Sequence, residues 1–200
     1  MADEAQAYKG YVLPYKRHTP LREEIEHQLF KDIIDSGIGV ITDWIPSESL
    51  KAPGTKPATL EEYGIGQSWK FANNNDETIT ARIKIPDYAF SNPTVSILFG
   101  WSSSVTDPGD DSKQARWQVE YLYNAVDSVV NAAAEGTAVD NLTVSTVAHG
   151  LVVSELSTPG LSVGDICMTI RLKRRADEAG DTLDSDDCWL HGLCLKIVTS

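Results

Sequence analysis

The segment Ala115–Tyr123 reads ARWQVEYLY, and it decides the fold class because its side chains alternate in character. Trp117, Val119, Tyr121 and Tyr123 occupy every second position, and the positions between the first three of them are polar. Successive side chains of a strand point to opposite faces. A period of two therefore predicts a strand with one buried face and one solvated face.

The same period recurs along the rest of the chain. Four further segments alternate in this way: Ile79–Ile85, Val95–Trp101, Ile166–Leu172 and Leu193–Ile197. Less regular apolar runs at Leu142–Val147 and Leu151–Leu156 add two strands, and turns rich in glycine and proline separate the runs. Apart from Asn124–Gly136, which fits a helical turn or a loop, no helical pattern stands between the strands. The sequence therefore predicts an antiparallel β-sandwich or barrel.

The first 65 residues differ from this pattern. Residues 1–20 have no period and fit an extended arm, and a helix is predicted to begin at Pro20 and to end before Gly37. Its apolar stripe consists of Leu21, Ile25, Leu29, Phe30, Ile33 and Ile34. A short strand at Val40–Ile45 and a linker rich in proline and glycine at residues 46–66 follow. We expect an arm, one amphipathic helix and a linker over residues 1–65, before a sandwich over residues 66–200.

The chain is acidic, because its 200 residues carry a formal net charge of −12. Phosphate neutralisation needs a basic field, so this charge argues against nucleic acid and against an anionic membrane as partners. No apolar run is long enough to span a bilayer, and residues 1–10 lack the basic start and the apolar stretch of a secretory signal. The three cysteines lack CxxC spacing, which fits a protein made in a reducing cytoplasm.

An acidic cluster near the C-terminus is the candidate metal site, with Asp184, Asp186 and Asp187 as oxygen ligands for Ca²⁺. The ligand order of an EF-hand loop is absent. We therefore favour a solvated loop whose acids pair with the basic residues at Arg171–Arg175. The sequence predicts no metal and no other cofactor.

No catalytic motif is present, since the sequence holds neither a GxSxG elbow, nor a glycine-rich phosphate loop, nor an HExxH pair. His191 would share a buried face with Leu193 if its strand alternates strictly, which predicts a hydrogen-bonded core histidine. We expect no catalytic residue and no enzyme activity.

The five tryptophans raise the alternative of sugar binding, since aromatic faces stack on sugars. Trp101 and Trp117 stand at inward positions of alternating strands, which is the behaviour of core residues. Trp44 lies outside these strands and is free to be an exposed anchor. Core packing is the interpretation that we favour for the others.

The order of several segments resembles a known family. The segments are SWKF (68–71), IKIPDY (83–88), VSILFGWSS (95–103), ARWQVEY (115–121), GDICMTIRL (164–172) and WLHGLCL (189–195). Together they are similar to the jelly-roll modules of structural proteins of tailed bacteriophages, such as capsid decoration proteins, head fibres and baseplate or tail-fibre components. The resemblance covers about Ser68 to Thr199. It implies an all-β jelly-roll sandwich and a non-catalytic virion component that assembles as a homotrimer.

The predicted attachment region is the N-terminal segment, because its helix needs a surface on which to bury an apolar stripe. Aromatic and arginine side chains dominate interface energies. The predicted partner-binding residues are Tyr8, Tyr11, Tyr15, Arg17, Leu21, Ile25, Leu29, Phe30 and Trp44. The expected partners are the major capsid protein or another virion protein, and further copies of this chain.

The leading expectation is a capsid decoration or cement protein that is made in the bacterial host cytoplasm and located in the virion. The first alternative is a tail, baseplate or head-fibre adhesion module that binds host-surface glycans. The second alternative is a glycan-processing enzyme on a β scaffold, which requires two carboxylates about 5–10 Å apart in a cleft.

Overall fold

The computed structural model describes residues 7–8, 11–12, 39–41, 44–85, 93–109, 111–127, 133–158, 160–162, 164–183 and 186–199. The chain divides into two compact units, Met1–Ile38 and Gly39–Ser200. In the first unit, β1 (Ala7–Tyr8) pairs antiparallel with β2 (Tyr11–Val12). The predicted helix over residues 20–36 lies outside the described residues.

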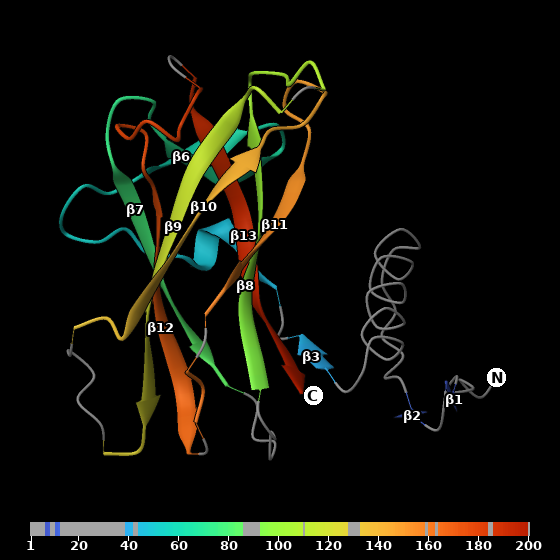
Figure 1. The fold of residues 1–200 in the computed structure, drawn as a ribbon, viewed down its shortest axis with the longest axis vertical. Coiled ribbons are helices and arrows are strands. Elements are labelled where there is room, and N and C mark those ends of the chain that lie inside the picture. The colour runs from blue at the N-terminus through green and yellow to red at the C-terminus, as the bar shows by residue number, and fades with distance from the viewer. Residues whose placement is uncertain are drawn as a thin grey trace. The chain divides into compact units, whose positions relative to one another are not determined.

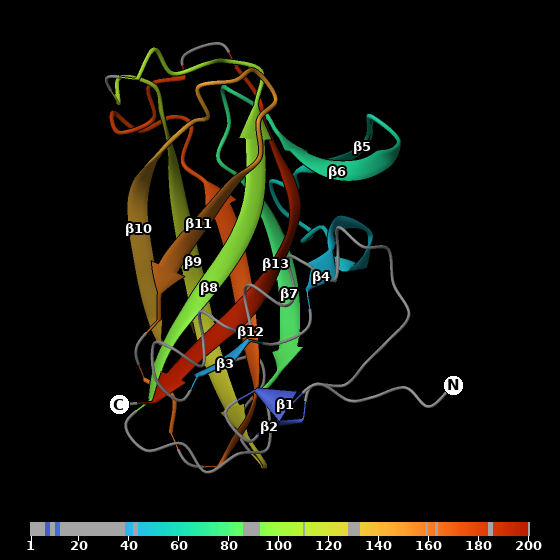
Figure 2. The ribbon, with the colours of Figure 1, turned by 90° about the vertical axis from the view of Figure 1, so that its right-hand side faces the viewer.

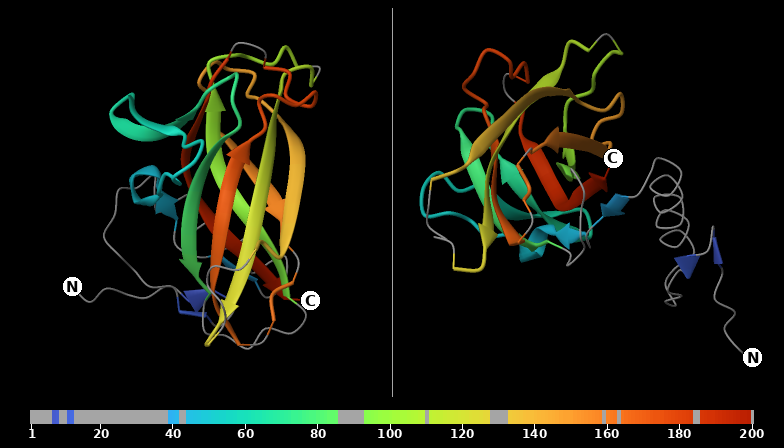
Figure 3. Two further views of the ribbon diagram at one scale, coloured as in Figure 1. Left: turned by 90° about the vertical axis from the view of Figure 1, so that its left-hand side faces the viewer. Right: turned by 60° about the horizontal axis from the view of Figure 1, so that its bottom comes forward.

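The second unit is a sandwich of two antiparallel sheets (Figures 1 and 3), which confirms the predicted all-β class. The four-stranded sheet has the order β10 (Gly136–Thr143), β9 (Gln114–Ala125), β12 (Asp165–Arg174) and β7 (Glu77–Lys84). The main path of the seven-stranded sheet is β11 (Val152–Ser157), β8 (Pro93–Ser103), β13 (Cys188–Thr199), β6 (Gly66–Phe71) and β5 (Thr59–Tyr63). Each alternating segment of the sequence falls on one of these strands.

Aromatic side chains from both sheets meet between the two layers. The ring centroid of Trp117 on β9 lies 5.0 Å from that of Phe71, 5.3 Å from that of Phe99 and 5.7 Å from that of Trp101. The four side chains are fully buried, and their edge-to-face arrangement is one that aromatic quadrupoles favour. The predicted inward positions of Trp101 and Trp117 are confirmed.

Three short segments pair with β13 along the edge that faces away from β8. Residues 188–190 pair with β6, residues 192–193 pair with β4 (Ile45–Pro46), and residues 196–198 pair with β3 (Gly39–Ile41). The 3-10 helix η1 (Ser47–Ser49) and β5 follow within the predicted linker. The sandwich therefore begins at Gly39 and not at residue 66, because long-range pairing with β13 and β6 orders a stretch that has no period of its own.

The β5–β6 hairpin projects from the sandwich near one end (Figure 2). Tyr63 pairs with Gly66, and Gly64 in the turn between them has a φ angle of 65°, which glycine adopts without a steric cost. Tyr63 is the last residue of β5, next to the turn. Among the residues that the structure describes, no helix is long and apolar enough to cross a membrane.

A β-bulge in β13 decides which of its side chains face outward. The pairing of β13 with β8 shifts register between Leu190 and Gly192. Leu190 and Leu193 are consequently both fully buried. Their numbers differ by three, and in a regular strand such a spacing would place the two side chains on opposite faces. The predicted core position of His191 beside Leu193 is wrong, because the extra residue turns the imidazole to the outer face of the sheet.

Candidate ligand-binding site

Four aromatic rings gather on the outer face of the seven-stranded sheet. The ring centroid of Tyr63 on β5 lies 5.0 Å from that of Trp189 and 5.2 Å from that of His191, both on β13. The imidazole of His149, between β10 and β11, lies 5.7 Å from the rings of Tyr63 and Trp189. We call these four side chains the ring cluster.

Strand alternation and the hairpin bring the ring cluster together. Trp189 stands between Cys188 and Leu190, which are both fully buried, so its side chain points away from the core. Ser102 on β8 lies directly opposite Trp189 in the sheet. Tyr63 reaches the same place because the β5–β6 hairpin carries it there.

A chain of hydrogen bonds fixes the rings. The Tyr63 hydroxyl is hydrogen-bonded to His149 Nδ1 at 2.7 Å and to Ser102 Oγ at 3.0 Å. His191 Nε2 lies 2.9 Å from Ser102 Oγ, and His191 Nδ1 lies 2.8 Å from Ser68 Oγ. Burial lowers the pKa of His191, so its ring is neutral and needs one donor and one acceptor. The hydroxyls of Ser68 and Ser102 supply both, and these hydrogen bonds hold the imidazole in one orientation.

Charged groups border the ring cluster. Lys70 on β6 lies beside Trp189 in the sheet, and its Nζ atom lies 3.1 Å from Asp187 Oδ2 and 3.6 Å from Glu61 Oε1. The hydrogen bond to Asp187 raises the pKa of Lys70. Asp187 also accepts a hydrogen bond from the Asn73 backbone N–H at 3.1 Å. These groups offer hydrogen-bond donors and acceptors at the edge of an aromatic surface.

Trp44 forms a second aromatic surface on this face. A Cβ atom added at Gly100 would lie 3.2 Å from the indole Cη2 atom, and one added at Gly192 would collide with the indole Nε1 atom. The indole therefore lies against the bare backbone of β8 and β13. Its exposed fraction of 45% confirms the prediction that Trp44 is an exposed aromatic residue.

The arrangement suits binding better than nucleophilic catalysis. Ser102 Oγ and His191 Nε2 have the spacing of a nucleophile and its base, but Ser102 is 0% exposed. The carboxylates of Glu61 and Asp187 both approach the ammonium group of Lys70. Apolar rings with a few oriented polar groups are the usual composition of a small-ligand site.

The acidic cluster that the sequence offered as a metal site is engaged in structural contacts. Asp184 lies outside the described residues, while Asp186 Oδ1 accepts a hydrogen bond from Ser104 Oγ at 3.0 Å. The part of the chain that the structure describes contains no group of three or more His, Cys, Asp or Glu side chains that could hold a metal ion.

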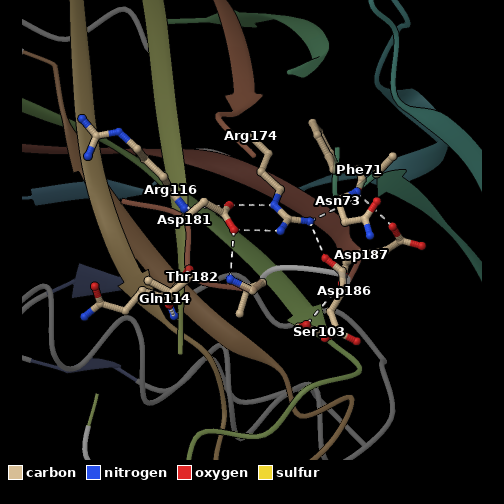
Figure 4. Close-up of polar contacts among 12 residues, drawn as sticks. Phe71, Asn73, Ser103, Gln114, Arg116, Arg174, Asp181, Thr182, Asp186 and Asp187 are labelled. Carbon is tan, nitrogen blue, oxygen red and sulfur yellow. Dashed lines mark hydrogen bonds and ion pairs between the residues drawn. The ribbon is translucent and has the colours of Figure 1, made fainter. Parts of the chain in front are cut away.

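Arg174 holds this acidic loop in place (Figure 4). Its guanidinium donates two hydrogen bonds to Asp181, from Nε at 2.8 Å and from Nη2 at 2.9 Å. Its Nη1 atom donates to the backbone oxygens of Asp186 at 2.8 Å and Phe71 at 3.3 Å. The loop acids do pair with the basic run, as expected, but this pair is buried and not solvated.

Of the predicted partner-binding residues, the structure describes Tyr8, Tyr11 and Trp44. Tyr8 and Tyr11 belong to the β1–β2 pair, and Trp44 lies on the outer face of the sheet. The candidates outside the described residues are Tyr15, Arg17, Leu21, Ile25, Leu29 and Phe30. Sequence reasoning missed the ring cluster, because Tyr63 stood in an expected linker and the bulge beside His191 has no sequence signal.

No family model and no curated protein matches this sequence. Similar solved structures include the CBM22-1 xylan-binding domain of Xyn10C from Paenibacillus barcinonensis, with 13% identity, a TM-score of 0.43, and coverage of 82% of this chain and 98% of that one. The C-terminal CBM6 of the laminarinase LamC from Zobellia galactanivorans has 12% identity, a TM-score of 0.44, and coverage of 80% and 99%.

A tailspike domain is also similar in part. The enzymatically active domain of tailspike protein 4 from bacteriophage CBA120 has 11% identity and a TM-score of 0.36, and the match covers 77% of this chain and 19% of that one. At these identities the similarities do not identify any binding residue. The resemblance to structural proteins of tailed bacteriophages stays a prediction.

Proposed function

We propose that the sandwich is a non-catalytic glycan-binding module that serves adhesion to a host surface. The observation that carries the proposal is the ring cluster, whose Tyr63 and Trp189 centroids lie 5.0 Å apart on an outer sheet face. A pyranose ring has an apolar C–H face and hydroxyl groups around its rim. The aromatic surface can stack on the C–H face of the sugar. The charged groups of Lys70, Asp187 and Glu61 can form hydrogen bonds with its hydroxyl groups.

The two outer faces of the sandwich differ in a way that supports this location. The four-stranded sheet presents polar and charged pairs, such as Arg171 with Glu120 at 2.9 Å and Arg82 with Thr169 at 3.3 Å, and its exposed apolar residue Val139 is aliphatic and not aromatic. The seven-stranded sheet presents the ring cluster and Trp44. Exposed apolar surface rimmed by polar groups is typical of an interaction site.

The adhesion module was the first alternative from the sequence, and it replaces the capsid decoration protein as the function that we favour. Most residues of the predicted capsid attachment lie outside the described residues. The ring cluster lies in the sandwich itself. The location in a virion rests on the resemblance of residues 68–199 to jelly-roll modules of tailed bacteriophages.

Affinity electrophoresis against immobilised polysaccharides and a glycan array test the proposal. The comparison uses the wild-type chain, Trp189→Ala, and Val139→Ala as a matched exposed apolar residue on the four-stranded sheet. Trp189→Ala should weaken binding at least about tenfold, because truncated aromatic anchors dominate binding energies, and Val139→Ala should bind like wild type.

Two results would overturn the proposal. One is the absence of glycan binding together with wild-type cosedimentation with empty capsids, which would restore the capsid decoration protein. The other is a release of reducing ends from the bound glycan, which would favour the enzyme alternative.

A further inference from the structure

Trp44 and the ring cluster lie side by side on one sheet face. Gly100 and Ser102 are two residues apart on β8, so their Cα atoms are about 6.8 Å apart and their side-chain directions agree. The indole of Trp44 lies over Gly100, and the Tyr63 hydroxyl binds Ser102. The two aromatic surfaces are therefore neighbours along the same strand.

The glycines beneath Trp44 have a packing role. Any side chain at Gly192 would collide with the indole, and one at Gly100 would crowd it from below. Glycine at both positions lets a large flat ring lie on the sheet and keep 45% of its surface exposed. A tryptophan that served the core would instead be buried, as Trp101 and Trp117 are.

The surroundings of the indole extend the apolar surface. Leu151 Cδ1 would lie 3.2 Å from a Cβ atom at Gly100, and Val153 pairs with Gly100 in the sheet. Both side chains are more than half exposed, at 64% and 58%. A ligand that covers only the ring cluster would leave this continuous apolar strip in water.

The charges near the rings limit the kind of ligand. Two carboxylates, of Glu61 and Asp187, and one ammonium group, of Lys70, border the ring cluster. The whole chain carries a formal net charge of −12. An anionic ligand would be repelled by both the site and the chain.

We propose that Trp44 is a second stacking subsite of the glycan site, and that the ligand is an uncharged oligosaccharide chain long enough to cover both Trp189 and Trp44. This inference rests on the proposed function. Its specific claim is that affinity rises with chain length and that Trp44 is the reason for the rise.

Isothermal titration with oligosaccharides of increasing length tests the claim. The probes are the cello-, xylo- and laminari-oligosaccharide series, with oligogalacturonates as the anionic series. We compare the wild-type chain, Trp44→Ala, Trp189→Ala and the Val139→Ala control. Trp44→Ala should leave the affinity for the shortest ligand unchanged and lower the affinity for long ligands about tenfold, whereas Trp189→Ala should lower both.

A second variant separates the indole from its support. Gly100→Ala keeps the Trp44 side chain but adds a Cβ atom 3.2 Å from its Cη2 atom, so the indole must shift by a few tenths of an ångström. This variant should reduce the gain in affinity with length in the same direction as Trp44→Ala, and by a smaller factor. Thermal melts confirm that each variant is folded.

The outcomes that overturn the inference differ from those that overturn the proposed function. If the wild-type chain binds no glycan, both the proposed function and the second subsite are wrong. Suppose that the wild-type chain binds glycans. If Trp44→Ala then binds oligosaccharides of every length like wild type, or loses the same factor of affinity at every length, the second subsite is wrong and the proposed function stands. Oligogalacturonates that bind as tightly as the neutral series overturn the claim of an uncharged ligand. Dissociation of an oligomer by Trp44→Ala, without a change in glycan affinity, would assign the indole to contacts between copies of the chain.

Discussion

The Tyr63 hydroxyl lies 2.7 Å from His149 Nδ1, although the two residues are 86 positions apart in the sequence. Tyr63 ends a strand of the projecting hairpin, and His149 stands in the connection between β10 and β11 with a φ angle of 59°. A left-handed conformation is uncommon for a residue other than glycine, and surrounding contacts must maintain it. This hydrogen bond ties two segments of the chain into one aromatic surface.

Replacement of Tyr63 by phenylalanine tests whether this hydrogen bond orients the ring cluster. Tyr63→Phe keeps the ring but removes the hydroxyl that bonds His149 and Ser102. We expect the free energy of unfolding to fall by about 1–3 kcal/mol, because each of the two hydrogen bonds has a usual net contribution of about 0.5–1.5 kcal/mol, and glycan affinity to fall several-fold. Urea denaturation and titration measure the two effects. Unchanged affinity in a folded variant would show that the hydroxyl does not orient the rings.

Asp181→Asn is expected to be severely destabilising. The side chains of Arg174 and Asp181 are 0% and 1% exposed, so the substitution leaves the guanidinium charge buried without its counter-ion. Loss of one partner of a buried pair costs about 3–5 kcal/mol of unfolding free energy. The matched control is Glu155→Gln, whose pair with Lys196 is partly exposed and whose loss should cost less than about 1 kcal/mol. Equal midpoints of urea denaturation for the two variants would contradict this expectation.

His191 is expected to make the fold less stable in mild acid. Burial lowers the pKa of His191 in the folded chain below the ordinary value of 6.5 that it has when unfolded. As the pH falls through 6.5, the unfolded chain takes up a proton that the folded chain does not, so stability decreases until the pH passes below the folded pKa. His191→Gln should have a shallower decrease over that range. Denaturation midpoints of the wild type and of His191→Gln at several pH values test this expectation. Parallel plots of midpoint against pH for the two proteins would refute it.

The cysteines should differ in their reactivity in the native protein. Burial raises the pKa of Cys188 to about 12 and that of Cys194 to about 11, whereas Cys167 is only partly buried. The thiolate is the reactive form, so we expect a disulfide reagent to modify Cys167 alone before unfolding. Denaturant should expose all three thiols. Reaction of Cys188 at the rate of Cys167 in the folded chain would be inconsistent with its burial.

The sequence predicted the exposure of Trp44 but not its neighbours. Trp44 was identified because it stands outside the alternating strands. The adjacent glycines carry no signal of their own, since a glycine in a strand fits a bulge, a bend or a close approach equally well. Only the packing of the indole against Gly100 and Gly192 distinguishes these roles.

The sequence alone determined that the chain forms an antiparallel β-sandwich or barrel and that Trp101 and Trp117 face its core, because the alternation of side chains along a strand is a local property. The tertiary structure alone decided that Tyr63, His149, Trp189 and His191 meet on an outer face. Their meeting depends on a one-residue bulge in β13 and on a hairpin that projects from the sandwich. Both features arise from pairings between segments far apart in the chain, and a local pattern does not encode such pairings.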